Sequence, residues 1–196
     1  RANKLSASDV AAARGGRVVG LCLPEAMRMR LCFASGFVLD MLPGVRDYIH
    51  LPHAERRAAF ADPANRARIA EALATLPETH TISKFGRFRI IDAQTPEVRA
   101  LVGRTIDDIA AERGQSAIDT IFDIVCADDL QTGLEPPVIG LDDDSWAERV
   151  RLLLEDPRVI AGGSDAGAHL DMMKTFACHT SFFAEAVRSR QLLSLE

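Results

Sequence analysis

Two side chains that could take part in hydrolysis stand close together in the stretch "DPRVIAGGSDAGAHLDMM", residues 156–173. Asp165 and His169 are four residues apart and are surrounded by glycine and alanine. A carboxylate can act as a general base or bind a metal ion, and an imidazole can contact the same substrate. The glycines allow unusual backbone torsion angles, and the alanines leave space beside the carboxylate. Asp165 and His169 are therefore candidate site residues.

The position of these residues depends on the element that precedes them. The apolar run at residues 159–161 predicts a buried strand that ends shortly before Asp165. In α/β proteins, ligands and catalytic groups lie beyond the carboxyl ends of parallel strands. In the alternative interpretation, Asp165 only caps the helix that follows, and His169 packs or forms hydrogen bonds at the start of that helix.

The rest of the chain shows the alternation of helices and strands that is typical of an α/β protein. The last part predicts a βαβα unit with parallel strands and a right-handed crossover. Strands are predicted at residues 17–23, 85–92, 136–141 and 159–161, and helices at 6–14, 95–103, 105–114, 116–130, 142–155 and 172–190. Two further helices, separated at Asp62-Pro63, are predicted within an excursion from the α/β core.

The other histidines and the acidic run give weaker candidates. His50 and His53 are three residues apart, but the proline between them breaks helical spacing, and His53 is predicted to start a solvated helix. His80 stands in a polar loop and is expected to face water, whereas His179 is expected in a core or on a helix face. The run at 142–144 is better explained as a helix cap than as a cation site.

Composition limits the classes of partner. With 47% hydrophobic and 26% charged residues the chain has ordinary globular composition. Its net charge of −5 argues against a nucleic-acid surface, and no apolar run approaches the ~20 residues of a membrane helix. The four cysteines are scattered through mainly apolar segments, as expected of reduced cysteines in a cytoplasmic protein.

Three stretches together resemble one enzyme family. The segment 156–173 resembles the last barrel strand and loop of the N-acyl-D-amino-acid deacylase (D-aminoacylase) branch of the amidohydrolase superfamily, in which a "GSD" carries an aspartate of the metal site. The stretch "LVGRTIDDIAAERGQSAIDTIFDIVCADDL" is similar to the helix pair that precedes this strand in the family. The stretch "PPVIGLDDDSWAERVRLLLEDPRVIAGGSD" is similar to the strand, helix and strand that close the barrel.

The resemblance implies an α/β fold, namely the closing strands and helices of a partial (β/α)₈ TIM barrel with a mainly helical insertion. The expected segments are a barrel strand and helix at 1–42, the small insertion at 43–100 and the closing βα units at 101–196. Asp165 is implied as a metal ligand and as the general base, and His169 as a looser match that contacts substrate. The family's other ligands are an early His-x-His, a Cys or bridging acid and two later histidines, and none is matched here.

The implied function is hydrolysis of the linear amide of N-acyl-D-amino acids by a metal-activated water. The metal is zinc or another divalent ion, bound by the full-length protein and not by this chain alone, which is expected to be an incomplete C-terminal portion without activity of its own. The alternatives are a cyclic-amide hydrolase of the hydantoinase or dihydropyrimidinase type, or a catalytically incomplete interaction module. An incomplete barrel would expose apolar strand edges, so self-association or pairing with the missing half is expected.

Overall fold

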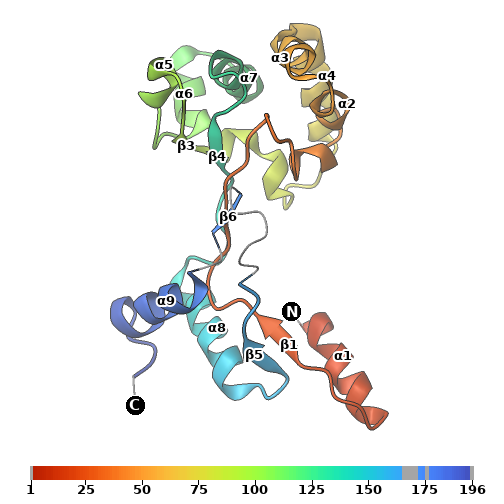
Figure 1. Ribbon diagram of the computed structural model, residues 1–196, viewed down its shortest axis with the longest axis vertical. Coiled ribbons are helices and arrows are strands. Elements are labelled where there is room, and N and C mark those ends of the chain that lie inside the picture. The colour runs from red at the N-terminus through yellow and green to blue at the C-terminus, as the bar shows by residue number, and fades with distance from the viewer. Residues whose placement is uncertain (1, 165–171, 175–176, 195–196) are drawn as a thin grey trace. The chain divides into compact units, whose positions relative to one another are not determined.

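The computed structural model describes residues 2–164, 172–174 and 177–194 (Figure 1). The chain divides into two compact units. The central unit comprises Met29–Pro137, and the terminal unit combines Arg1–Arg28 with Val138–Glu196. The predicted insertion, residues 43–100, lies wholly within the central unit.

The central unit is mainly helical and contains the larger hydrophobic core. Its α-helices are α2 (Arg46–Ile49), α3 (His53–Ala61), α4 (Pro63–Ala74), α5 (Pro96–Arg99), α6 (Ile106–Arg113) and α7 (Ala117–Ala127). Single 3₁₀ turns occur at Leu39–Met41, Thr81–Ser83 and Phe85–Arg87, and the strands are β3 (Arg89–Asp92) and β4 (Gly133–Glu135). The short strand β2 (Arg28–Met29) spans the sequence boundary between the two units.

A cluster of buried phenylalanines holds the helices of this unit together. Phe60 of α3 stacks on Phe122 of α7 with ring centroids 4.9 Å apart, and Phe33 meets both rings edge-on. Such ring pairs add roughly 0.5–1.5 kcal/mol each beyond the burial of their area. Arg66 of α4 links the two helices that carry the stacked rings. Its Nε–H donates to the Phe60 carbonyl at 2.8 Å, and its Nη1 lies 2.7 Å from Asp123 Oδ1 in α7.

Local capping signals place several helix ends where the sequence predicts them. The Thr105 side chain accepts from the Asp108 backbone N–H, and the Asp108 side chain accepts from the Thr105 backbone N–H, which forms a capping box at the start of α6. The same helix ends at Gly114 with φ +64°. The predicted break at Asp62-Pro63 is confirmed, since Asp62 caps α4 and accepts from Ala64 N–H at 2.8 Å.

The strand predicted at residues 136–141 is wrong. The strand found is β4, three residues earlier, and it pairs antiparallel with β3 through Arg89↔Glu135 and Ile90↔Leu134. The ladder stops at Pro136-Pro137 because proline has no N–H to donate. The predicted parallel crossover from 136–141 to 159–161 is therefore not formed.

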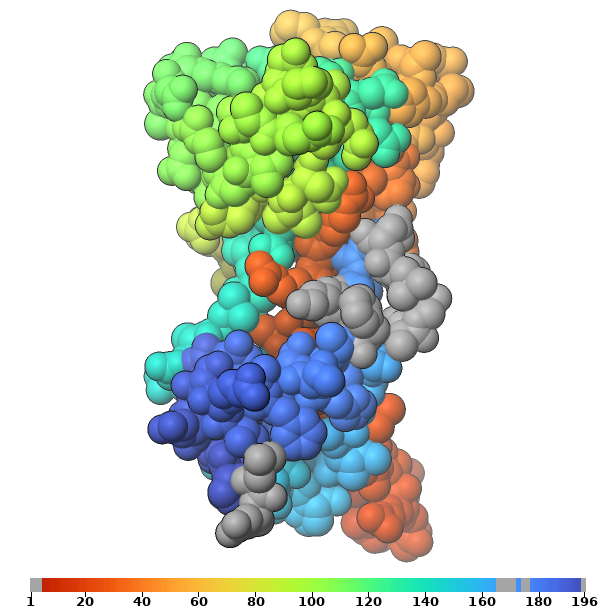
Figure 2. Space-filling view, turned by 60° about the vertical axis from the view of Figure 1, so that its left-hand side comes forward, coloured from red at the N-terminus to blue at the C-terminus, as the bar shows by residue number. Residues whose placement is uncertain are grey.

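The terminal unit contains the strand that leads to the predicted site. Its elements are α1 (Ala2–Ala13), β1 (Gly20–Cys22), α8 (Asp143–Glu155), β5 (Val159–Ala161), β6 (Met173–Lys174), α9 (Cys178–Phe182) and a π-helix at Phe183–Ser189. β5 pairs in parallel with β1 through Leu21↔Ile160 and Cys22↔Ala161. α9 lies against α8 (Figures 1 and 2), where Phe182 meets Trp146 with centroids 6.5 Å apart.

Several further predicted elements differ from those in the structure. Of the strand predicted at 17–23 only β1 is formed, and of the helix predicted at 95–103 only α5 is formed. The strand predicted at 85–92 covers only β3, because Phe85 and Phe88 are both buried at a spacing of three, which fits a turn rather than strand alternation. The helix predicted at 172–190 is replaced by β6, α9 and the π-helix among the residues described there. Short apolar runs such as Met172-Met173 suit strand and helix equally, so periodicity could not separate the two.

Within the described residues, no helix combines the length and apolar character needed to cross a membrane.

Candidate functional site

The two predicted site residues, Asp165 and His169, lie outside the described residues. The described chain continues from β5 through Gly162 and Gly163 to Ser164, directly before Asp165. Gly163 has φ +85°, a torsion angle that residues with a side chain rarely adopt. The predicted end of the strand at residue 161 is confirmed.

The carboxyl ends of β1 and β5 lie side by side. Gly162 N–H donates to the Cys22 carbonyl at 3.0 Å, immediately after the last residue pair of the parallel ladder. The residues that follow Cys22 and the residues that follow Ala161 therefore leave the ribbon at the same edge. In α/β folds this is the edge where ligands bind.

A pocket of about 320 Å³ lies within the terminal unit beside β1. Its walls are mostly aliphatic and include two ionisable side chains, Glu25 and Arg149. The lining residues are Leu5, Gly20, Leu21, Cys22, Leu23, Glu25, Arg149, Leu152 and Val159. A mainly apolar pocket with a few convergent polar groups is the usual form of a small-molecule site.

Glu25 places a carboxylate in this pocket with little exposure to solvent. It follows Pro24 just beyond β1, and the residue is only 8% exposed. Among the described residues, none forms a hydrogen bond with the buried atom Glu25 Oε1. A buried acceptor without a donor costs about 1–3 kcal/mol, and more when it is charged. Glu25 thus brings to the lining of the pocket a buried carboxylate oxygen that has no donor among the described residues.

Arg149 brings positive charge to the same pocket from α8. Its guanidinium lies over the Trp146 ring, 4.5 Å from the centroid, and its Nη2–H donates to the Gly140 carbonyl at 3.3 Å. The residue is 7% exposed, so packing and the indole ring hold its position. The pocket therefore carries one acidic and one basic side chain at defined places in its wall.

Arg158, directly before β5, contacts the helix that supplies Leu5 to the pocket. Its guanidinium lies 3.0 Å from both carboxylate oxygens of Asp9 in α1, and it also contacts Asp156 at 2.7 Å. The hydrogen bonds from the Arg158 side chain and backbone lower the pKa of Asp156 to about 2. Because α1 carries both Leu5 and Asp9, this ion-pair network positions one wall of the pocket.

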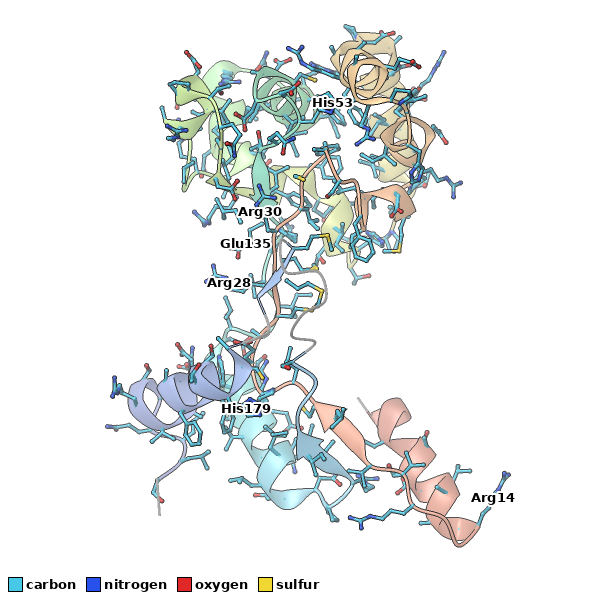
Figure 3. The ribbon with its side chains drawn as sticks, viewed as in Figure 1. Arg14, Arg28, Arg30, His53, Glu135 and His179 are labelled. Atoms are coloured by element: carbon cyan, nitrogen blue, oxygen red, sulfur yellow. The ribbon has the colours of Figure 1, made fainter. Side chains whose placement is uncertain are left out.

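His53 belongs to a different cavity, within the central unit. It lies at the start of α3 as predicted, and its Nε2 is 2.9 Å from Asp129 Oδ1 (Figure 3). This hydrogen bond lowers the pKa of Asp129. The same cavity of about 420 Å³ is lined by Arg57 and Cys126, and burial raises the pKa of the Cys126 thiol. The cysteine is therefore held as a thiol, which is a poor nucleophile.

The structure places the remaining histidines apart from these pockets. His50 is exposed, and His179 is exposed on α9 (Figure 3). The prediction that His80 faces water is wrong in part, because the side chain is half-buried and no described residue forms a hydrogen bond with its buried Nδ1. Its backbone N–H closes a turn onto the Pro77 carbonyl at 2.9 Å, which draws the residue toward the protein.

The capping interpretation of the acidic run 142–144 is confirmed. Asp142 is the N-cap of α8 and accepts from the Ser145 backbone N–H and hydroxyl, both at 2.8 Å. Among the residues that the structure describes, no three His, Cys, Asp or Glu side chains are grouped so as to hold a metal ion. The described residues thus do not fit a complete metal centre.

Sequence reasoning did not single out Glu25 or Arg149. A usable pattern was present for Glu25, since "LCLPE" places a carboxylate directly after a predicted strand, as "VIAGGSD" does for Asp165. No local pattern distinguishes Arg149 from the other charged residues of its helix, because its burial depends on packing against Trp146 and Gly140.

Comparisons of the chain with family models, with curated proteins and with solved structures found no match. The candidate site therefore stands on its residues and their geometry.

Proposed function

We propose that the chain is the C-terminal part of a metal-dependent amidohydrolase that cleaves the linear amide of N-acyl-D-amino acids. The corresponding fold is a partial (β/α)₈ barrel, in which β1 and β5 are neighbouring strands and residues 43–100 belong to an insertion. In this proposal Asp165 accepts a proton from the attacking water and passes it to the leaving nitrogen. His169 contacts the substrate.

The observation that carries the proposal is the parallel pairing of β5 with β1. It supports the proposal because "GGSD" then follows the carboxyl end of a parallel strand, where barrel enzymes carry their catalytic residues. The left-handed torsion angle of Gly163 is consistent with a tight exit from that strand.

The described residues offer no group of three metal ligands, so no catalytic step is assigned to a metal here. The proposal gives this chain a single ligand, Asp165, and places the others in sequence that precedes it in the family pattern. Zinc or another divalent ion would accordingly be bound only by the longer protein. Elemental analysis of the 196-residue chain should find less than one zinc per chain, and one tightly bound zinc would contradict this ligand assignment.

Exposed apolar residues and free cysteines support the proposed partner surface and compartment. Leu21 of β1 and Ile160 of β5 are paired residues that are 66% and 54% exposed, so the ribbon presents apolar side chains to solvent. Such a surface supports self-association or pairing with further barrel strands. The cysteines Cys22, Cys32, Cys126 and Cys178 are free thiols, which supports a cytoplasmic location.

The deciding experiment replaces Asp165 with Asn in the protein that includes the preceding sequence. We expect Asp165→Asn to lower the hydrolysis of N-acetyl-D-amino acids by at least about 10²-fold, because the amide cannot accept the proton. Release of free amine is the assay, circular dichroism verifies the fold, and Asp171→Asn is the matched control on the same segment.

Two outcomes of this experiment would count against the proposal. Near-normal turnover by Asp165→Asn would show that Asp165 is not the general base. Turnover of hydantoin or dihydrouracil by the unsubstituted protein, without turnover of linear amides, would favour the cyclic-amide alternative.

A further inference from the structure

We propose that the pocket around Glu25 binds a small aliphatic primary amine, whose ammonium group pairs with the Glu25 carboxylate that lines the pocket and whose alkyl body contacts the leucine and valine walls. This inference rests on the pocket alone and is independent of the amidohydrolase proposal. It assigns a ligand site to residues that lie entirely within the terminal unit.

The first argument is the unsatisfied oxygen. Glu25 is more than nine-tenths buried and lines the pocket, and no described residue forms a hydrogen bond with its Oε1. Buried polar groups are almost always paired, so an unpaired one needs a specific explanation. A ligand ammonium beside the carboxylate compensates this buried group, because a hydrogen bond between two charged groups is charge-assisted.

The second argument is the character of the walls. Leu5 comes from α1, Leu23 follows β1, and Leu152 comes from α8, so three separate segments present aliphatic side chains to one space. Val159 of β5 is 7% exposed and completes the lining. Burial of an alkyl group against such walls removes apolar area from water and therefore favours binding.

The third argument concerns the size and the charge of the ligand. A cavity of about 320 Å³ is at the lower end of the range for small-molecule pockets, so it suits a short alkyl chain. Arg149 contributes positive charge to the wall, which opposes a second cationic group on the ligand. The pocket should therefore prefer a monoamine to a diamine of similar length.

The test is an NMR titration of the protein with isopentylamine at neutral pH, compared with isopentyl alcohol and cadaverine. Isopentyl alcohol has the same alkyl body without the charge, and cadaverine carries two ammonium groups. We expect saturable shifts of the Leu5, Leu152 and Val159 methyl resonances with isopentylamine, and at least tenfold weaker binding of the other two.

Two variants assign the binding to Glu25. Glu25→Gln should weaken the binding of isopentylamine at least tenfold and leave the binding of the alcohol unchanged. Glu155→Gln, at an exposed position of α8, should change the affinity for neither ligand. Glu25→Asp, which withdraws the carboxylate by one methylene, should give an intermediate affinity. If Glu25→Gln does not fold, Glu25→Asp and the comparison of ligands on the unsubstituted protein still decide.

Equal affinity for the amine and the alcohol would overturn the proposal, as would unchanged amine binding by a folded Glu25→Gln. Shifts confined to surface acidic residues outside the pocket would also overturn it. These results leave the amidohydrolase proposal untouched, since that proposal depends on the activity of Asp165→Asn and not on ligand binding at Glu25.

Discussion

Asp128 is a fully buried carboxylate at the end of α7 that holds together two segments of the central unit. Its Oδ1 accepts from the backbone N–H groups of Gln94 and Thr95 at 2.9 and 2.6 Å, and its Oδ2 accepts from the Thr132 hydroxyl at 2.8 Å. Thr95 is the N-cap of α5 but makes no capping bond with its own side chain. Asp128 therefore holds the segment that leads into α5 from a distant part of the chain.

We expect Asp128→Ala to destabilise the protein severely, because three donors lose their acceptor at once. A hydrogen bond to a charged group contributes about 1.5–3 kcal/mol, but removal of the carboxylate also removes its own cost of burial. Three buried neutral donors left without an acceptor cost about 1–3 kcal/mol each, so after this offset the net loss should be about 3–5 kcal/mol. Asp128→Asn should cost only about 1–2 kcal/mol, because Oδ1 can keep both backbone donors while Nδ2–H donates to Thr132 Oγ1.

The measurement is urea unfolding of the two variants and of Thr132→Val, which removes only the hydroxyl bond and should cost about 1 kcal/mol. The slope of the free energy of unfolding against urea should stay constant, so that a shifted midpoint reports stability. If Asp128→Ala cost less than about 1 kcal/mol, or if Asp128→Asn were as damaging as Asp128→Ala, the carboxylate would not hold these segments through its three hydrogen bonds.

Two other predictions concern a glycine and an ion pair. Gly36 has φ +75° and an added Cβ would overlap Ile49 Cγ1, so Gly36→Ala should cost about 2–4 kcal/mol, whereas Gly114→Ala, at φ +64° with open space, should cost about 1 kcal/mol in the same urea assay. Arg158 lowers the pKa of Asp156 to about 2, below the ~3.9 of an unfolded chain, so this pair stabilises the fold above pH ~4 and loses that effect as pH falls toward 2. Asp156→Asn should accordingly lower the melting temperature at pH 6 but not at pH 2. An equal fall in melting temperature at both pH values would contradict this dependence of stability on the ionisation of Asp156.

The sequence predicted those helix ends that carry a capping residue, because the signals are local. The capping box of Thr105 and Asp108 and the left-handed Gly114 involve residues within one turn of the helix they delimit. Asp62-Pro63 is equally local, since the proline occupies a first-turn position where its missing N–H costs nothing. Such positions need no knowledge of the partner elements.

Strand positions were predicted less well, because a strand is defined by its partner. The apolar character of Val138-Ile139 predicted a strand, yet the antiparallel partner β3 pairs with residues 133–135 and the ladder ends at the prolines. The pairing of β1 with β5 joins segments from opposite ends of the sequence. Periodicity reports burial of a segment and carries no information on which segment lies beside it.

The difference between local signals and contacts between distant segments also explains what could be predicted of the site. The rule that polar groups beyond a strand end are functional candidates selected Asp165, and it applies equally to Glu25, which follows the neighbouring strand at the same edge. The rule takes no account of burial, and Glu25 lines a pocket whose walls come from α1 and α8 as well as from β1. Among the described residues, none donates to its buried Oε1. An unpaired buried carboxylate costs stability, so Glu25→Gln should fold at least as well as the unsubstituted protein even as it loses the amine. A variant that gains stability while it loses binding is the behaviour expected of a ligand site, whereas a structural carboxylate such as Asp128 loses stability when it is replaced.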